Sequence, residues 1–335
     1  MTDDRETEYQ DGIAAHHSFA AILEKSRPLA EQGDVSAQVM LGDFLYLRGT
    51  AKEKEQGVEW YRKAAVQGDT EAQISLARLY GLGMYIARDY AQSADWWRKA
   101  AEQGSAAAQY GLANCYCRGK GVAKDVGQAA EWYRKAAEQG YVLAQVSLGS
   151  LYKDSEDIPQ DHALSAEWYL RAAEKGYAPA QIELGKLYLA GQGVAKDDGR
   201  AMDWYRKAAE QGDASAQTRL GELYLAGQGA PRDEKQAADW FHQAAENGDY
   251  DAPKYLGELY LNGQGVSQDH VQAYMWLSLT GGAANEDAIK SRDLMAEKMT
   301  ASQIEEAQHL VREWSTAHHK VRWDLMCAAD AGVAS

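Results

Sequence analysis

The chain has 335 residues, of which 45% are hydrophobic and 25% are charged, as in an ordinary folded protein. Its formal net charge of −15 argues against nucleic-acid backbones and anionic membranes as main partners, because both carry negative charge themselves. No apolar run is long enough for a membrane-spanning helix, so we expect no membrane partner.

The start of the sequence, as given, does not predict an export signal. Residues 1–15 are expected to form a flexible acidic tail. Met1–Gly12 lacks the basic start and the apolar stretch of a signal peptide. As given, the sequence therefore predicts a cytoplasmic protein, or a periplasmic one if a leader has been removed. Residues 16–33 are expected to form an N-terminal capping helix, which Pro28 kinks or interrupts and Gly33 ends.

A tryptophan returns every 36 residues and divides most of the chain into equal units. The tryptophans of this series are Trp60, Trp96, Trp132, Trp168, Trp204, Trp240 and Trp276. In six of these seven units another aromatic residue follows at once: Tyr61, Trp97, Tyr133, Tyr169, Tyr205 and Phe241. A fixed period of this length is typical of stacked supersecondary units. We expect the tryptophans to fill the seam between neighbouring helices.

The unit at 178–213 shows most clearly how each repeat is built. Its first helix is expected to begin near Pro179, since proline is favoured in the first helical turn. Gly185 lies inside that helix, where glycine costs about 1 kcal/mol relative to alanine. We therefore expect it to let the partner helix approach closely. Asp197 is placed to cap the second helix and Gly212 to end it, so the unit is a helix-turn-helix.

The other units repeat these residues at the same places. The capping aspartates are Asp89, Asp125, Asp161, Asp197, Asp233 and Asp269. The closing glycines are Gly68, Gly104, Gly140, Gly176, Gly212 and Gly248. The second helices also carry acidic residues four positions before basic ones, at Glu59 and Lys63, Asp95 and Lys99, Glu131 and Lys135, Glu167 and Arg171, and Asp203 and Lys207. This spacing predicts ion pairs on a solvated outer face.

The 36-residue period stops after Trp276, where a C-terminal cap is expected to begin. A helix at about 285–298 replaces an eighth first helix. Thr300 and Gln303 have the spacing of a capping box, which predicts a long helix from about residue 301. One face of that helix carries Ile304, Ala307, Leu310 and Trp314. We expect residues 286–335 to cover the last open face of the array, as the ends of solenoids require.

Two short helices cannot bury these apolar stripes alone, but stacked units can. The expected fold is therefore all-α. It is an α/α superhelical solenoid of seven 36-residue helix-turn-helix repeats at residues 34–285, with helical caps at both ends. Of the three cysteines, Cys115 and Cys117 lie two apart on a predicted helix, where side chains do not face each other. We expect unpaired thiols and no disulfide framework.

The repeated pattern is Ala-x-x-x-Leu-Gly-x-Leu-Tyr, then Gly-x-Gly-Val, Asp, Ala-x-x-Trp-Tyr-x-x-Ala-Ala and Gly. It resembles the Sel-1-like repeat, a relative of the tetratricopeptide repeat, over residues 34–285. The resemblance implies a bacterial adaptor or scaffold that binds a protein or peptide and is not an enzyme. The alternative that it implies is a toxin-neutralising or virulence-associated interaction protein. A weak hydrolase activity is claimed for a cysteine-rich branch, from which this chain departs because it lacks a disulfide in each repeat.

Curved helical solenoids usually bind ligands on the concave face, which their first helices line. At 100° per residue, three columns of first-helix side chains point away from the buried stripe and predict an amphipathic groove for a peptide. The candidate ligand-binding residues are Ile74, Arg78, Tyr110, Asn114, Cys117, Val146, Ser150, Ile182, Lys186, Leu189, Glu222, Leu225 and Glu258. Tyr110 is the strongest of them, because tyrosine is enriched at interfaces. The alternative is that Leu189, Leu225 and Leu261 simply pack between adjacent units.

No pattern in the sequence predicts catalysis, a metal site or a cofactor. The Gly-x-Gly loops lack the preceding strand and the following Lys-Ser/Thr of a phosphate-binding loop. The adjacent histidines at 16–17 and at 318–319 point about 100° apart on a helix, so neither pair chelates a metal by itself. We expect a monomer whose partner is a protein or peptide.

Overall fold

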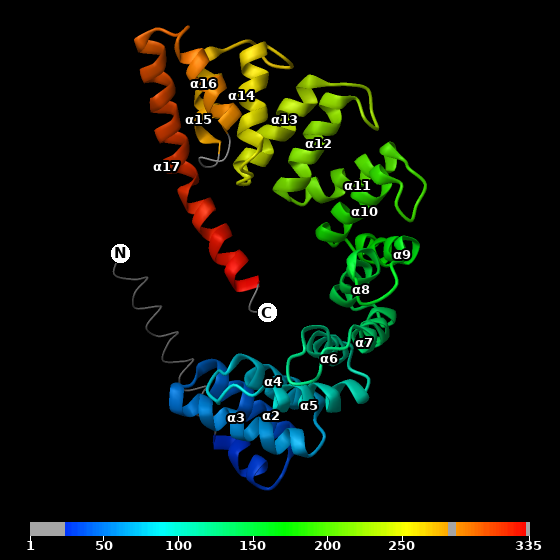
Figure 1. Cartoon of the computed structure of the whole chain (residues 1–335). Helices are drawn as coiled ribbons and strands as arrows, with labels where there is room; N and C mark the ends of the chain where they lie inside the picture. Colours follow the sequence, from blue (N-terminus) through cyan, green and yellow to red (C-terminus); the bar gives the residue numbers. More distant parts are fainter. Residues whose placement is uncertain (1–23, 281–285, 333–335) are drawn as a thin grey trace, which may run out of the picture. The chain divides into compact units, whose positions relative to one another are not determined.

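Every regular element of the described chain is a helix (Figure 1). The computed structural model describes residues 24–280 and 286–332, with side chains for 24–280 and 287–318. The acidic tail expected at 1–15 lies outside these residues, as does the beginning of the expected capping helix.

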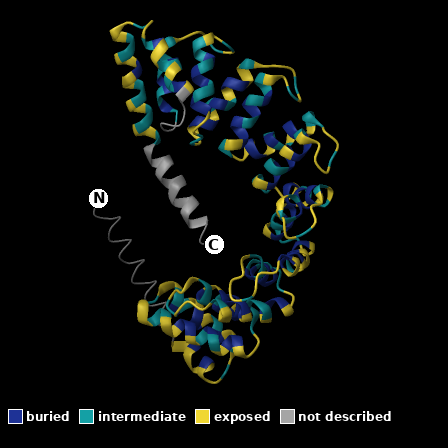
Figure 2. Cartoon of the chain, in the orientation of Figure 1, coloured by how far each residue is buried: buried dark blue, intermediate teal, exposed yellow. Residues whose placement is uncertain are grey.

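The chain forms two compact units, Met1–Gln160 and Asp161–Ser335. Each is a stack of antiparallel helix pairs in which the helices of the repeats pack on their neighbours along the chain. Buried residues gather where the helices face one another, while the connecting loops are exposed (Figure 2). The α/α solenoid expected from the repeats is thereby confirmed.

The first unit begins with residues 24–31, which are helical, and Gly33 ends this stretch with a φ of 98°. The helix continues through Pro28, so the interruption expected there does not occur. The helices that follow are α2 (Val35–Arg48), α3 (Ala51–Val66), α4 (Thr70–Leu82), α5 (Tyr90–Glu102), α6 (Ala106–Arg118), α7 (Val126–Glu138) and α8 (Val142–Asp154).

The second unit contains the remaining repeats and the C-terminal cap. Its helices are α9 (His162–Glu174), α10 (Ala178–Ala190), α11 (Asp198–Glu210), α12 (Ala214–Ala226), α13 (Glu234–Glu246), α14 (Ala252–Asn262), α15 (His270–Leu279), α16 (Glu286–Ala296) and α17 (Ala301–Gly332). The even-numbered helices α2 to α14 are the first helices of the repeats, and the odd-numbered helices α3 to α15 are the second.

The local signals of the fifth repeat act as expected. The Asp197 carboxylate accepts a hydrogen bond from the backbone N–H of Arg200 at 2.9 Å and so caps α11. A Cβ atom at Gly185 would lie 2.7 Å from the ring of Tyr205, so only glycine lets α11 pack this closely on α10. These local interactions fix the positions of α10 and α11, whose side chains help to line the site described below.

Buried glutamines connect successive repeats. Each side-chain amide donates to the carbonyl of the alanine eight residues earlier: Gln38 to Ala30, Gln73 to Ala65, Gln109 to Ala101, Gln145 to Ala137, Gln181 to Ala173 and Gln217 to Ala209. In five of them the amide oxygen also accepts from the end of the next second helix: Gln67, Gln103, Gln139, Gln211 and Asn247 are the donors. Because a buried amide is costly unless it is bonded, this ladder explains the alanine-glutamine pair of each repeat.

The aromatic residue that follows the repeating tryptophan is the more deeply buried of the two in most repeats. Tyr133 is 3% exposed and Phe241 is fully buried, whereas Trp132 and Trp240 are half-buried. Trp132 packs against an apolar cluster that combines Leu112 of its own repeat with Ala100 and Ala101 of the repeat before it. The tryptophans therefore lie at the seam, as expected, but the neighbouring ring fills the centre of each helix pair.

The ion pairs predicted on the second helices form mostly with other partners. Glu167 does pair with Arg171 four residues on, at 2.6 Å. In four other repeats the predicted lysine instead lies over the tryptophan ring three residues before it: Lys63, Lys99, Lys135 and Lys207, at 3.8–3.9 Å from the ring centre. The acids Glu59, Asp95 and Asp203 pair with arginines three residues on. The prediction failed here because a ring face competes for the ammonium group.

The C-terminal cap has the expected form. Thr300 and Gln303 exchange hydrogen bonds as a capping box at the start of α17. Ala307 is fully buried, and the Trp314 ring packs edge-on against that of Trp276 at 4.7 Å between centroids. The cap thereby covers the last repeat of its unit.

Candidate functional site

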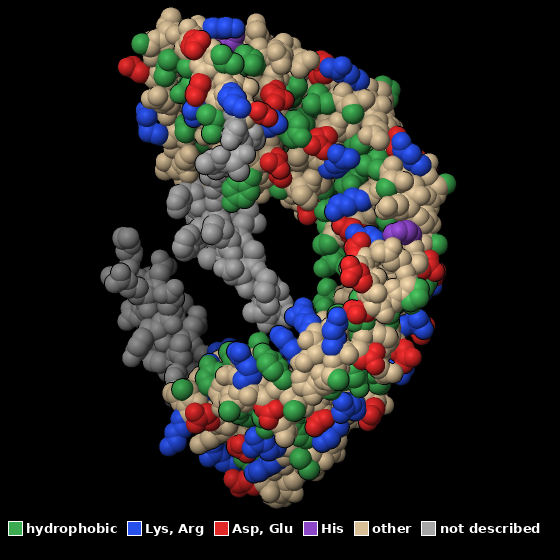
Figure 3. Space-filling model, viewed as in Figure 1, with side chains coloured by type: hydrophobic (Ala, Val, Ile, Leu, Met, Phe, Trp, Pro, Cys, Tyr) green, Lys and Arg blue, Asp and Glu red, His purple; other side chains and the backbone are tan. Residues whose placement is uncertain are grey.

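The predicted ligand-binding residues all lie on first helices. We call the exposed surface of these helices the first-helix face. The residues in the first unit are Ile74, Arg78, Tyr110, Asn114, Cys117, Val146 and Ser150, and those in the second are Ile182, Lys186, Leu189, Glu222, Leu225 and Glu258. Acidic and basic side chains are interspersed over the surface seen in Figure 3.

Ile74 is a core residue, so its assignment to the ligand site was wrong. Its side chain is 3% exposed and packs in a cluster with Ala101 and Ala108. The alanines leave a gap that the larger isoleucine fills, because a close-packed interior tolerates no void of that size.

Tyr110 and Asn114 are engaged within the chain. The Tyr110 ring lies between those of Tyr133 and Tyr141, at 5.6 and 5.2 Å between centroids. Asn114 accepts a hydrogen bond from the Tyr133 hydroxyl at 2.8 Å and donates one to the Tyr110 carbonyl at 3.1 Å. Both residues thus hold the third repeat together. Arg78 and Ser150 are exposed, while Cys117 and Val146 are half-buried.

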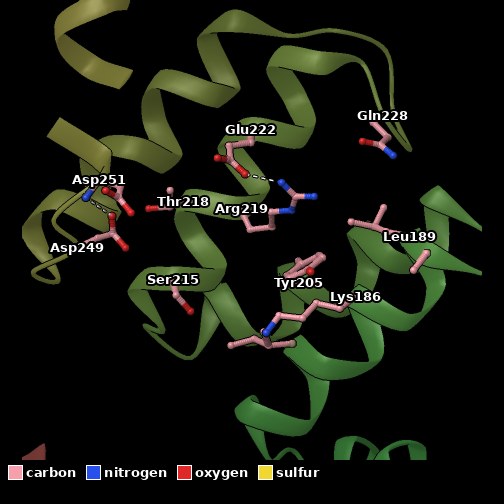
Figure 4. A pocket seen from close by; sticks show the side chains of 12 residues that line it. Lys186, Leu189, Tyr205, Ser215, Thr218, Arg219, Glu222, Gln228, Asp249 and Asp251 are labelled. Atoms are coloured by element: carbon pink, nitrogen blue, oxygen red, sulfur yellow. Dashed lines mark hydrogen bonds and ion pairs between the residues drawn. The ribbon is translucent and has the colours of Figure 1, made fainter. Parts of the chain in front are cut away.

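Four predicted residues meet at one cavity of about 670 Å³ in the second unit (Figure 4). Ile182, Lys186 and Leu189 come from α10, and Glu222 comes from α12. The full lining is Ile182, Lys186, Leu189, Ala190, Tyr205, Ser215, Thr218, Arg219, Glu222, Gln228, Asp249 and Asp251. Leu189 also packs against the cluster around Tyr205, so it belongs partly to the cavity and partly to the interface between repeats.

Asp249 and Asp251 are cavity residues that the sequence prediction missed. The signal that could have found them is Pro253, which replaces the glutamine of the other repeats. Proline is tolerated only in the first helical turn, so α14 begins at Ala252 and has 11 residues, whereas α12 has 13. Asp251 consequently lies outside the helix at the edge of the cavity.

The two cationic side chains of the cavity each have an acidic partner. Lys186 pairs with Glu183, and Arg219 pairs with Glu222, both at 2.6 Å. Glu222 also accepts a hydrogen bond from the Tyr255 hydroxyl. The charge that remains at the cavity is therefore that of the two aspartates, and the cavity is acidic at the end formed by the loop before α14.

The hydroxyl groups of Tyr205, Ser215 and Thr218 complete the cavity. Burial raises the pKa of Tyr205 to about 12, so its hydroxyl stays neutral at physiological pH. Thr218 is 8% exposed, and its Oγ1 has no hydrogen-bond partner within the described part of the chain. Figure 4 shows this oxygen directed toward the end of the cavity that Asp249 and Asp251 line.

Thr218→Val is expected to leave the free energy of unfolding unchanged or to raise it by up to about 1 kcal/mol, because it removes a buried polar group that lacks a partner. Valine already occupies the equivalent positions 39 and 146 of other repeats. Urea denaturation followed by circular dichroism measures the change. A clear loss of stability would show that the hydroxyl has an internal partner after all.

Leu225 and Glu258 lie beyond this cavity. Leu225 packs against the core cluster around Phe241, as does Leu261 against the cluster around Leu277. Glu258 is half-buried, and burial raises the pKa of its carboxyl group, with Lys254 acting in the opposite direction. The interpretation that the leucines pack between adjacent repeats therefore holds for Leu225, whereas Leu261 packs between the last repeat and the C-terminal cap and Leu189 also lines the cavity.

A second cavity, of about 440 Å³, lies on α2 in the first unit. Met40 and Leu47 line it and are 50% and 74% exposed. The sequence prediction included neither residue, since both lie outside the three columns.

The described residues could also offer metal-binding groups or reactive thiols. They contain no group of three or more His, Cys, Asp or Glu side chains that could hold a metal ion. Cys115 and Cys117 are free thiols, as expected, and burial raises the pKa of Cys115 to about 11. None of the described helices combines the length and the apolar character needed to cross a membrane.

The solved structures that are similar to this chain include two with at least 30% sequence identity over most of its length. One is a protective antigen present in uropathogenic Escherichia coli strains that displays an SLR fold, with 36% sequence identity and a TM-score of 0.73. The match covers 91% of this chain but 66% of the antigen, so this chain spans slightly less than two thirds of that protein. The other is a Sel1 repeat protein from Oxalobacter formigenes, with 30% identity, a TM-score of 0.59 and coverage of 82% and 91% of the two chains. No curated protein sequence matches the chain.

Comparison with known protein families finds the Sel1 repeat in seven consecutive segments, most of which begin at the first residue of a first helix. They are residues 35–69, 70–105, 106–141, 142–177, 178–213, 214–249 and 254–280. These segments cover well over half of the chain and coincide with the helix pairs α2–α3 to α14–α15. The chain belongs to the Sel1 repeat family.

Proposed function

We propose that this protein is a non-enzymatic scaffold that binds a segment of a partner protein on its first-helix face. The cavity lined by α10, α12 and the loop before α14 carries this proposal. Its wall combines apolar side chains with charged and hydroxyl groups, and such mixed surfaces suit peptide recognition.

The fold supports the same conclusion. Sel1 repeat proteins generally mediate protein–protein interactions, and the repeat is typically a non-catalytic interaction fold. Two conspicuous regular features of this chain are buried in its core: the glutamine ladder and, in most repeats, the ring that follows the tryptophan. Side chains that vary from repeat to repeat lie on the first-helix face, which is where a specific partner would be distinguished from others.

Site-specific photocrosslinking tests the proposal. A photoreactive phenylalanine analogue would replace Lys186 on the first-helix face, and in a matched control it would replace Glu210 on the second helix α11. Both positions are exposed, so neither replacement should disturb folding. After irradiation of the full-length protein in its native cell extract, we expect a crosslinked partner at position 186 and none at position 210.

Crosslinks at position 210 alone would move the binding surface to the second helices. Absence of crosslinks at position 186, and likewise at Ser150 and Arg78, would contradict a role for the first-helix face. Catalytic turnover that survives rigorous purification would contradict a purely non-enzymatic scaffold.

A narrower second candidate is a virulence-associated interaction protein. It is supported by the similarity to the protective antigen of uropathogenic Escherichia coli, which extends over 91% of this chain at 36% identity. The same crosslinking experiment, repeated with an extract of host cells, distinguishes it. A specific host protein bound at position 186 would favour this role.

A further inference from the structure

We propose that the cavity of the second unit recognises a basic side chain, arginine or lysine, next to an apolar residue in the partner segment. This inference rests on the proposed function and specifies which peptides the site selects. The basic group would lie at the end of the cavity formed by Asp249, Asp251 and Thr218.

The two aspartates supply charge that the chain itself leaves unpaired. Both cations of the cavity already have acidic partners, Glu183 for Lys186 and Glu222 for Arg219. For the carboxylate of Asp251, no hydrogen bond or ion pair forms within the described part of the chain. An incoming cation therefore meets uncompensated negative charge, in a protein whose net charge is −15.

The carboxylate of Asp249 is held in place before any ligand arrives. Its Oδ1 accepts hydrogen bonds from the backbone N–H groups of Asp251 and Ala252, each at 2.8 Å. These bonds orient the group, and Oδ2 is left to face a ligand. Such preorganisation lowers the entropic cost of binding.

Thr218 provides a second line of evidence for a basic ligand, and this evidence does not depend on the charge of the aspartates. Its hydroxyl is more than nine-tenths buried, lines the cavity and has no hydrogen-bond partner among the described residues. A buried polar group without a partner is unfavourable, and a guanidinium or ammonium group offers only donors. The Thr218 oxygen can accept one of these while the aspartates accept others.

The rest of the cavity wall selects the neighbouring residue of the partner. Ile182 contributes to its apolar part, together with Leu189 and the ring of Tyr205 (Figure 4). An aliphatic or aromatic side chain beside the basic one would cover these groups. The expected motif is therefore short, with one basic and one apolar side chain adjacent or nearly so.

The acidic end is specific to this repeat, although the array is otherwise regular. The residues equivalent to Thr218 in four other repeats are apolar: Val39, Ile74, Val146 and Ile182. The late helix start that places Asp251 at the cavity occurs only at Pro253 among the repeats of the described chain. Two departures from the repeat pattern thus coincide at one cavity.

Peptide selection on the full-length protein tests the proposal. A random library of dodecapeptides displayed on phage would be selected against the immobilised protein, and the recovered sequences compared with the unselected library. We expect enrichment of arginine or lysine beside an apolar residue. In fluorescence anisotropy with the best recovered peptide, replacing its arginine by uncharged citrulline, or its lysine by acetyl-lysine, should weaken binding about tenfold or more.

Variants of the protein locate the contact. Asp251→Asn should weaken binding of the same peptide about three- to tenfold, and Thr218→Val by a few-fold, since each removes one partner of the basic group. Asp203→Asn on α11 is the matched control, because it removes the same charge from the same unit outside the cavity. It should leave binding nearly unchanged. Melting curves of all three variants check that they remain folded.

The possible failures are distinguishable. Recovered peptides without a basic residue overturn the proposal, and so does equal binding by Asp251→Asn and Asp203→Asn. A selection that recovers no peptide overturns it as well. In each of these cases a crosslinked partner at position 186 leaves the proposed function standing, whereas the absence of that crosslink removes both.

Discussion

Replacing Tyr133 with alanine is expected to lower the free energy of unfolding by about 3–5 kcal/mol, the usual cost of truncating a buried aromatic side chain. The ring is 3% exposed and lies at the centre of the third helix pair. Its hydroxyl also donates to Asn114 at 2.8 Å, and that partner would be left without its bond. Urea denaturation followed by far-ultraviolet circular dichroism measures the change.

The neighbouring Trp132 is the matched control. Although it is the larger residue, it is half-buried, so Trp132→Ala should cost less, about 1–3 kcal/mol. Tyr133→Phe separates the two contributions of the tyrosine, because it removes the hydroxyl and keeps the ring. If the tryptophan variant proved the less stable of the two alanine variants, the assignment of the core to the second aromatic would be wrong.

Gly193→Ala is expected to cost about 3 kcal/mol or more, because two unfavourable effects combine. The residue has a φ of 71°, in the left-handed region that disfavours a side chain. An added Cβ would also lie 1.9 Å from the backbone carbonyl oxygen of His162, so the loop after α10 would have to move away from the start of α9.

Gly212→Ala separates these two effects. Gly212 has a φ of 87°, but a Cβ there would have no neighbour within 4 Å. This variant should therefore show only the conformational cost, about 1–2 kcal/mol. Equal losses of stability for the two variants, measured by the same urea titration, would mean that the contact between the loop and α9 contributes nothing.

The helices could be predicted from the sequence because their signals are local. Asp197 caps α11 through a bond to a residue only three positions away, and Gly212 follows the last turn of that helix. The capping box of Thr300 and Gln303 is local in the same way. Interactions within a few residues do not depend on how the rest of the chain packs, so the repeat pattern was sufficient to locate them.

Predictions that depended on neighbouring repeats were less successful. A helical period gives the direction of a side chain, but it does not tell how closely the next helix approaches. Ile74 points away from the stripe of its own helix and is nevertheless buried, because small alanines of the following repeat leave room for it. Tyr110 is likewise held by two tyrosine rings.

The sequence by itself determined the fold. The period of 36 residues, the helix caps and the closing glycines can each be recognised from residues that are close together in the chain. Only the tertiary structure decided that the ring after each tryptophan fills the core of most repeats. It also decided where the candidate site lies. Thr218, Asp249 and Asp251 meet at one cavity because Pro253 delays the start of α14 beside a hydroxyl that has no internal partner. Whether these side chains come together depends on distances between helices, and the repeat pattern of the sequence does not determine those distances.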